Sequence, residues 1–296
     1  MTTTSVGAGR IGARAQGILV FCMSTVLLTV QDALTKLLTD TYTPIEVLFY
    51  RGAAALIPVA MIVGLSGGWR RLRTTRPMTN LARGVISLVT SILVVWSFKL
   101  LPLAEALAII FINPLIVTAL SAPTLGERVT WRQWGAVAVG FVGALLIIRP
   151  SGGAPLDWSV LVPIGAAVLG AARDLMTRHL GASDHPSTVL FYTMVVMFLG
   201  SAVLVGWSGT HAPSSAEWWL ILAAAVLVTG AYWTQIIGFK LAAVAVIAPY
   251  KYLSLVWAGL LGWAIWGDVM EPVKAAGCLL VVAGGIYLLR AEASKA

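Results

Sequence analysis

Long apolar runs separated by short polar loops recur along the whole chain and limit what it can fold into. A bilayer core requires about 20 mostly apolar residues per helix. Ten segments meet this requirement: 17–38, 45–66, 79–98, 103–124, 131–148, 158–178, 187–206, 217–238, 243–266 and 272–289. Only 11% of the 296 residues are charged, against about 25% in an ordinary soluble domain. The sequence predicts an all-α integral membrane protein with ten transmembrane helices.

Lysine and arginine are distributed unevenly between the two sets of loops. Fourteen, including Arg83 and Arg178, fall on the side of the N-terminus, and four fall on the other side. The positive-inside rule then places both termini in the cytoplasm and the chain in the cytoplasmic membrane as a multi-pass protein. The formal net charge of +8 follows from these loops, so lipid rather than nucleic acid is the expected surrounding.

The chain contains an internal repeat. When residues 32–50 are set over residues 174–192, eight of nineteen positions are identical without a gap, which corresponds to a shift of 142 residues. At a shift of 141, Phe98-Lys99-Leu100 matches Phe239-Lys240-Leu241, and Gly126-Glu127 matches Gly267-Asp268. Shared Phe, Lys, Pro and Gly positions are not explained by an apolar composition, so the match indicates a true repeat.

Each half of the repeat holds five predicted spans. Because five is odd, the second half enters the membrane from the opposite side. We therefore predict two inverted repeats, residues 1–150 and residues 151–296. Inverted repeats are typical of secondary transporters, which place their substrate site near the midplane between the halves.

One stretch of the first half resembles a known family. Residues 101–150 contain a proline-led fourth span, an LGE turn, a tryptophan-rich entry to the fifth span and a glycine-rich fifth span that ends in Arg-Pro. This pattern is similar to the EamA-type domain of the drug/metabolite transporter superfamily, and residues 248–268 repeat it more weakly. The arrangement in residues 32–51 is most similar to the branch that holds bacterial riboflavin and S-adenosylmethionine transporters.

The resemblance implies a fold and an activity. It implies that the first four helices of each half surround a central cavity, with the fifth and tenth helices at the periphery. It also implies transport of a small organic metabolite, whose identity the fold does not fix.

Charged residues near the ends of two predicted hairpins are candidates for gating or coupling. Asp32 and Lys36 are four residues apart on one helix and can form a favourable pair, and Glu46 and Arg51 follow at the start of the next span. The second half keeps an acid at the matching position, Asp174. Alternating gates and simple interfacial anchors both fit this pattern, since charges near helix ends are inexpensive.

The deepest charge predicts a substrate site. Lys251 lies about eight residues into the ninth span, between Tyr250 and Tyr252, too deep for its ammonium group to reach water easily. Asn113 precedes a proline at similar depth in the fourth span. We therefore predict substrate contacts from Lys251, its two tyrosine neighbours and Asn113, with a structural ion pair of Lys251 as the alternative.

Further candidates are weaker. Gln235 and Trp96 can offer hydrogen bonds and a stacking surface, although tryptophan at a helix end is typical of interfacial anchors. Glu105 follows a proline at the start of a helix, where the helix dipole alone favours an acid, so gating is only one of its two interpretations.

Other functional classes fit the sequence less well. The three histidines form no HExxH motif, so neither a metal site nor a cofactor is expected. An intramembrane enzyme that uses Asp32 and Asp174 is the alternative to a secondary-active transporter. A monomer and a homodimer are both compatible with the sequence.

Overall fold

The computed structural model describes most of the chain, and every regular element in this part is helical. The described residues are 4–39, 41–100, 103–148, 158–181 and 183–266, with isolated residues between 272 and 287. The predicted span 272–289 and the predicted domain boundary at residue 150 lie largely outside them.

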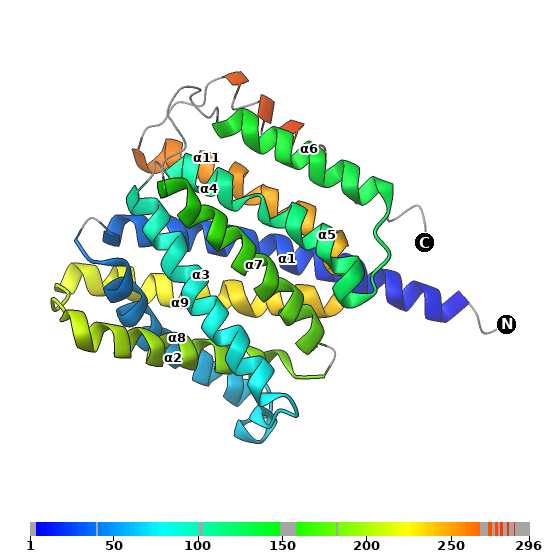
Figure 1. Ribbon diagram of the computed structural model, residues 1–296. Helices are drawn as coiled ribbons and strands as arrows, with labels where there is room; N and C mark the ends of the chain where they lie inside the picture. The colour runs from blue at the N-terminus through cyan, green and yellow to red at the C-terminus, as the bar shows by residue number, and fades with distance from the viewer. Residues whose placement is uncertain are drawn as a thin grey trace.

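The long helices follow the predicted spans closely (Figure 1). The first half contains α1 (Thr4–Thr39), α2 (Pro44–Leu65), η1 (Trp69–Leu72), α3 (Pro77–Leu100), α4 (Leu103–Ile110), α5 (Asn113–Leu125) and α6 (Trp131–Ile148). The second half contains η2 (Trp158–Val160), α7 (Leu161–Gly181), α8 (Pro186–Ser208), α9 (Ser215–Leu241), α10 (Val244–Ile247), η3 (Ala248–Tyr252) and α11 (Leu253–Trp266).

Two predicted spans are broken helices. The fourth span divides into α4 and α5, because Pro114, the second residue of α5, cannot donate a backbone hydrogen bond. The ninth span divides into α10, the 3-10 turn η3 and α11, and η3 likewise has a proline in its first turn. The breaks therefore lie in corresponding helices of the two halves.

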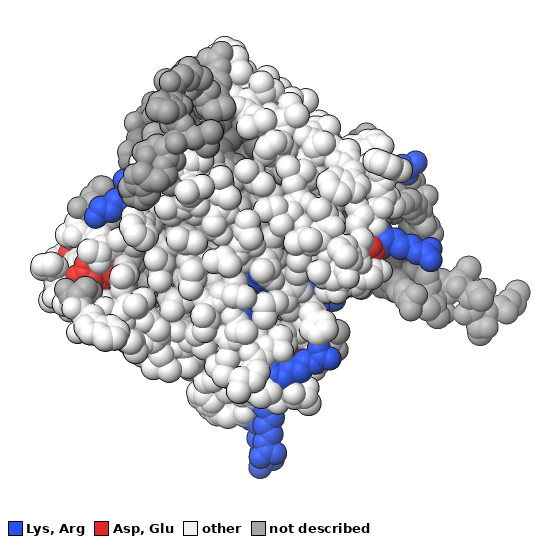
Figure 2. All heavy atoms as spheres, in the orientation of Figure 1, with Lys and Arg blue, Asp and Glu red and all other residues white. Residues whose placement is uncertain are grey.

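Five helices of the described part are long and apolar enough to cross a membrane: Ala15–Thr39, Pro44–Leu65, Pro77–Leu100, Pro186–Trp207 and Ser215–Leu241. The broken helices are individually too short for this criterion. One face of the molecule is broadly uncharged, and most of its lysine and arginine side chains lie towards the margins (Figure 2). The count of ten spans therefore stays a prediction, together with the orientation.

The two halves interleave rather than lie side by side. Helix α9 packs against α1 and α2, and its repeat counterpart α3 packs against α7 and α8. Helix α6 lies at one edge (Figure 1), where it contacts α4, α5 and η3. This peripheral position is the one that the family resemblance implied for the fifth helix.

Arg83 is buried inside the helix bundle. It was counted among the basic residues on the cytoplasmic side, within the predicted span 79–98, and it is 1% exposed. Its Nε donates to Thr177 Oγ1 at 2.7 Å, and a terminal nitrogen donates to Thr193 Oγ1. The burial is possible because α3 brings its first turns between α7 and α8, whose threonine hydroxyls accept hydrogen bonds from the guanidinium.

Candidate functional site

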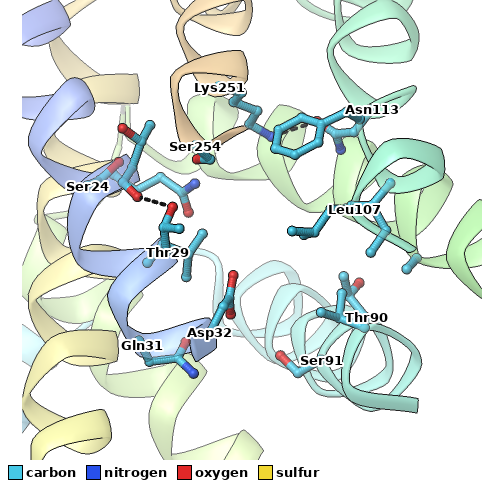
Figure 3. A pocket seen from close by; sticks show the side chains of 18 of the residues that line it. Ser24, Thr29, Gln31, Asp32, Thr90, Ser91, Leu107, Asn113, Lys251 and Ser254 are labelled. Atoms are coloured by element: carbon cyan, nitrogen blue, oxygen red, sulfur yellow. Dashed lines mark hydrogen bonds between the residues drawn. The ribbon is translucent and has the colours of Figure 1, made fainter. Parts of the chain in front are cut away.

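A cavity lies at the level of the two helix breaks (Figure 3). Its walls come from α1, α2, α3, α4, α5, α7, α9, η3 and α11, so both halves contribute. Among the described residues, four charged side chains line it: Asp32, Arg51, Arg173 and Lys251. The lining therefore combines apolar walls with charges that would be expensive in contact with lipid.

Lys251 is the centre of a buried charge cluster. Its ammonium group donates to the carboxylate of Asp174 and, at 2.6 Å, to Asn113 Oδ1 (Figure 3). Asp174 is fully buried, and its second oxygen accepts two hydrogen bonds from Arg173 at 3.1 and 3.2 Å. Arg173 also lies over the ring of Tyr232, 5.9 Å from its centroid. The single negative charge of Asp174 thus faces the two positive charges of Lys251 and Arg173.

The helix breaks hold this cluster in place. The amide of Asn113 donates to the backbone oxygen of Ala167 at 3.1 Å, which ties the start of α5 to α7. Its oxygen is left to accept from Lys251. The 3-10 turn η3 aims Lys251 into the cavity, whereas the aromatic side chains on either side face protein.

Asp32 forms a second pole of the cavity. Its carboxylate points into the cavity from α1 (Figure 3) and has no hydrogen-bond partner among the described residues. Arg51 lies on α2 nearby and donates to Thr35 Oγ1 at 3.3 Å. Asp32 is therefore available to a hydrogen-bond donor or a cationic group of a ligand.

Polar side chains that the sequence analysis did not single out complete the lining. Thr25 and Thr29 precede Asp32 on α1, and Thr90 and Ser91 lie on α3. Their sequence signal is a stripe of small polar residues, spaced three and four apart, in otherwise apolar helices. Arg173, which directly precedes Asp174 in the sequence, also belongs to the lining.

Three predicted substrate contacts lie elsewhere. Tyr250 is buried in a core cluster with residues of α1, α7 and α9. Tyr252 is fully buried and packs against Phe111 and Gly140, and Trp96 is 44% exposed on α3. None of the three lines the cavity. For the two tyrosines the reason is that η3 turns about 120° per residue, which points both side chains away from the side of Lys251.

The remaining predicted positions divide between the cavity and the helix ends. Asn113 and Gln235 line the cavity. Lys36 lies in the last turn of α1, outside the lining. Glu46 caps α2 together with Thr43 and accepts from the backbone nitrogen of His211 at 3.0 Å. Glu46 thus joins α2 to the α8–α9 loop. The side chain of Glu105 lies outside the described residues, so its predicted role stays a prediction.

An intramembrane enzyme would need metal ligands or a pair of similarly placed acids. Within the described ranges, no group of three or more His, Cys, Asp or Glu side chains is placed to hold a metal ion. Asp32 and Asp174 have different surroundings, since one faces the open cavity and the other contacts Lys251 and Arg173.

Both halves of the chain match one protein-family description. The model of the EamA-like transporter family matches residues 15–149 and again residues 157–290. The chain belongs to the EamA-like transporter family. Membership agrees with the motifs in residues 101–150 and with the internal repeat.

Relatives of this EamA-family chain are named transporters. It is 27% identical over 279 residues to the pseudopaline exporter CntI of Pseudomonas aeruginosa, covering 93% of this chain and 96% of the exporter. It is 27% identical to the riboflavin transporter of Rhizobium johnstonii, covering 76% and 74%. It is 24% identical to the S-adenosylmethionine uptake transporter of Rickettsia prowazekii, covering 93% of each. These relatives confirm the predicted superfamily and support a role in membrane transport.

A solved crystal structure shares the fold. Its TM-score is 0.76 at 20% sequence identity, with 95% of this chain and 96% of that chain covered. At this identity the likeness shows the fold alone.

Proposed function

We propose that the protein is a secondary-active transporter that moves a small anionic organic metabolite across the cytoplasmic membrane by alternating access. The proposal combines the family membership with a polar cavity between two interleaved halves. Broken helices at corresponding positions of inverted repeats commonly mark the substrate site of such transporters.

The excess of positive charge at the cavity is the observation that supports an anionic substrate. Among the side chains that the structure describes, three cations, Arg51, Arg173 and Lys251, stand against two carboxylates, Asp32 and Asp174. Arg83 adds a fourth buried cation nearby. Because a charge removed from water is costly unless it is compensated, an anionic group of the substrate would complete the balance.

The substrate would bind between two poles. Its anionic group would contact Arg173 and Lys251, and a donor group, such as an amine or hydroxyl, would face the carboxylate of Asp32. The cavity encloses about 150 Å³, similar to a cavity that admits benzene. A larger metabolite therefore requires the cavity to widen, which alternating access provides.

The relatives differ in what their names say they move, namely pseudopaline, riboflavin and S-adenosylmethionine. The charge excess favours an acid over a neutral or a net cationic solute for this chain. We therefore place an organic anion first among candidate substrates.

A thermal-stability screen tests the proposal. The purified protein would be heated with metabolite fractions separated by charge, and each stabilising solute would then be tested for exchange in proteoliposomes. We expect stabilisation from the anionic fractions, followed by exchange. Stabilising solutes confined to neutral or cationic fractions would contradict the proposed substrate class, and binding without exchange would contradict transport.

A further inference from the structure

The lining of the cavity is distributed unevenly along the broken helices. Its lining includes residues of α4 and α11, but from α5 only the first two residues and from α10 none. Helix α4 begins, and α11 ends, at the end of the bundle where α3 ends. The part of the lining that comes from the broken helices therefore lies towards that end, which we call the α3 end. The opposite end, where α5, α7 and α9 terminate, is called the α9 end.

Arg178 ties three segments together at the α9 end. From the last turn of α7, one terminal nitrogen donates to the backbone oxygens of Phe239 and Lys240 at 2.8 and 3.1 Å. Its Nε donates to Glu127 Oε1 at 3.2 Å. The same oxygen accepts from the backbone nitrogen of Val244 at 3.3 Å. One guanidinium thus connects α7, the end of α9 and the α5–α6 loop.

The contact is suited to form and break. The last carbonyls of a helix lack partners within the helix, and a cation near a helix C-terminus is favoured by the dipole. The guanidinium fork satisfies several acceptors at once. The Arg178 side chain is nevertheless 30% exposed, so its charge can return to water at small cost when the contact opens.

The internal repeat provides a counterpart in the first half. The shift of 142 places Lys36 at the position of Arg178. The shift of 141 places Phe98 and Lys99 at the positions of Phe239 and Lys240. Lys36 lies in the last turn of α1, and Phe98 and Lys99 lie in the last turn of α3. A base and two terminal carbonyls therefore recur in the first half.

We infer that Arg178 closes the α9 end through these contacts, and that Lys36 closes the α3 end by binding the backbone oxygens of Phe98 and Lys99 in the alternate conformation. Two inverted halves exchange roles when the cavity changes its facing side, so the two contacts alternate. These closing contacts presuppose the alternating access proposed above.

Distances between spin labels on the full-length purified protein test the inference without a transported solute. In a variant whose two cysteines are replaced by alanine, one label pair at Ala122 and Ser183 reports the α9 end. A second pair at Thr41 and Trp96 reports the α3 end. Pulsed electron paramagnetic resonance then measures both distance distributions.

Glu127→Gln is the main variant, because it keeps the shape of the side chain and removes the charge that Arg178 contacts. We expect the ratio of long to short Ala122–Ser183 distances to rise about threefold to tenfold, as for one hydrogen bond of ordinary strength, because the glutamine oxygen can still accept from Arg178 but without the negative charge. The Thr41–Trp96 distances should shorten together with it. Arg178→Lys should give a shift between those of the wild-type protein and Glu127→Gln. If Glu127→Gln does not purify as a monodisperse species, the distances in Arg178→Lys test the role of Arg178 instead.

Two further variants complete the design. Arg76→Met removes an arginine at the same end. The side chain of Arg76 contacts His179, whereas Arg178 contacts Glu127 and the backbone oxygens at the end of α9, so this variant should leave both distributions unchanged. Lys36→Met should reduce the short Thr41–Trp96 population.

Unchanged distances in Glu127→Gln and Arg178→Lys, or an equal shift in Arg76→Met, would overturn the role of Arg178. An unchanged Thr41–Trp96 distribution in Lys36→Met would overturn the role of Lys36. Because no solute is involved, failure here leaves the transport test standing.

Discussion

The two aspartates that the repeat pairs have unlike surroundings, and their substitution should separate stability from binding. Asp174 compensates Lys251 and Arg173 in a fully buried position. Asp174→Asn should therefore lower the free energy of unfolding by about 3–5 kcal/mol, the loss that follows when one partner of a buried ion pair is removed. Asp32→Asn should cost less stability, because Asp32 has no hydrogen bond to lose within the described part, while it weakens solute binding. Chemical denaturation in detergent measures the first effect, and equal losses in the two variants would contradict the assignment.

At the scale of single residues, the sequence predicted the position of Lys251 better than it predicted where the neighbouring side chains point. The depth of Lys251 and the Asn113-Pro114 pair were sufficient to place both at the cavity. Tyr250 and Tyr252 were predicted as substrate contacts because they flank Lys251, but in the 3-10 turn η3 each neighbour points about 120° away from it. The burial of Arg83 was missed because its acceptors, Thr177 and Thr193, lie about a hundred residues away.

The contact between α6 and η3 gives a prediction at the scale of elements. A Cβ atom added at Gly140 would overlap the ring of Tyr252, whereas nothing lies within 4 Å of one added at Gly135 on the same helix. Gly140→Ala should thus lower the free energy of unfolding by about 1–3 kcal/mol through overpacking. Gly135→Ala should leave it unchanged or raise it, since alanine favours helix. Thermal unfolding of the two variants checks this, and a harmless Gly140→Ala would show that α6 can move away from η3.

Element boundaries were largely predictable because turn chemistry marks them. Thr43 and Ser214 each form a capping box with a glutamate three residues later, and Gly126 ends α5 with a φ of 66°. The breaks in the fourth and ninth spans were not predicted as helix ends, because an apolar run long enough to cross a bilayer conceals an interruption. Their prolines were the visible signal.

The orientation of the whole molecule is a prediction from charge. Even without Arg83, the basic residues are concentrated in the loops on the side of both termini. A reporter that is active only in the periplasm should give a signal when fused after Thr210 and none when fused after Gly68 or Ser183. The reverse pattern would contradict the predicted orientation, which places the loops at Gly68 and Ser183, and with them the α9 end, in the cytoplasm.

The interleaving of the halves could not be derived from the repeat alone. The repeat indicates two similar units of opposite orientation, and each unit might have packed by itself. Instead, the third helix of each half packs on the first two helices of the other half. Contacts between distant segments, such as Lys251 with Asp174 and Asn113, follow from this arrangement and carry no local sequence signal.

The central claim is that an organic anion crosses the membrane through the cavity at Lys251. Counterflow of a stabilising anion in proteoliposomes measures it most directly, with Lys251→Met compared with Lys99→Met, a matched change at an exposed lysine outside the cavity lining. We expect exchange in the wild-type protein and in Lys99→Met, and a loss of at least about tenfold in Lys251→Met, since a charge-assisted contact with the anion is removed. Wild-type exchange in a correctly folded Lys251→Met protein would contradict the account.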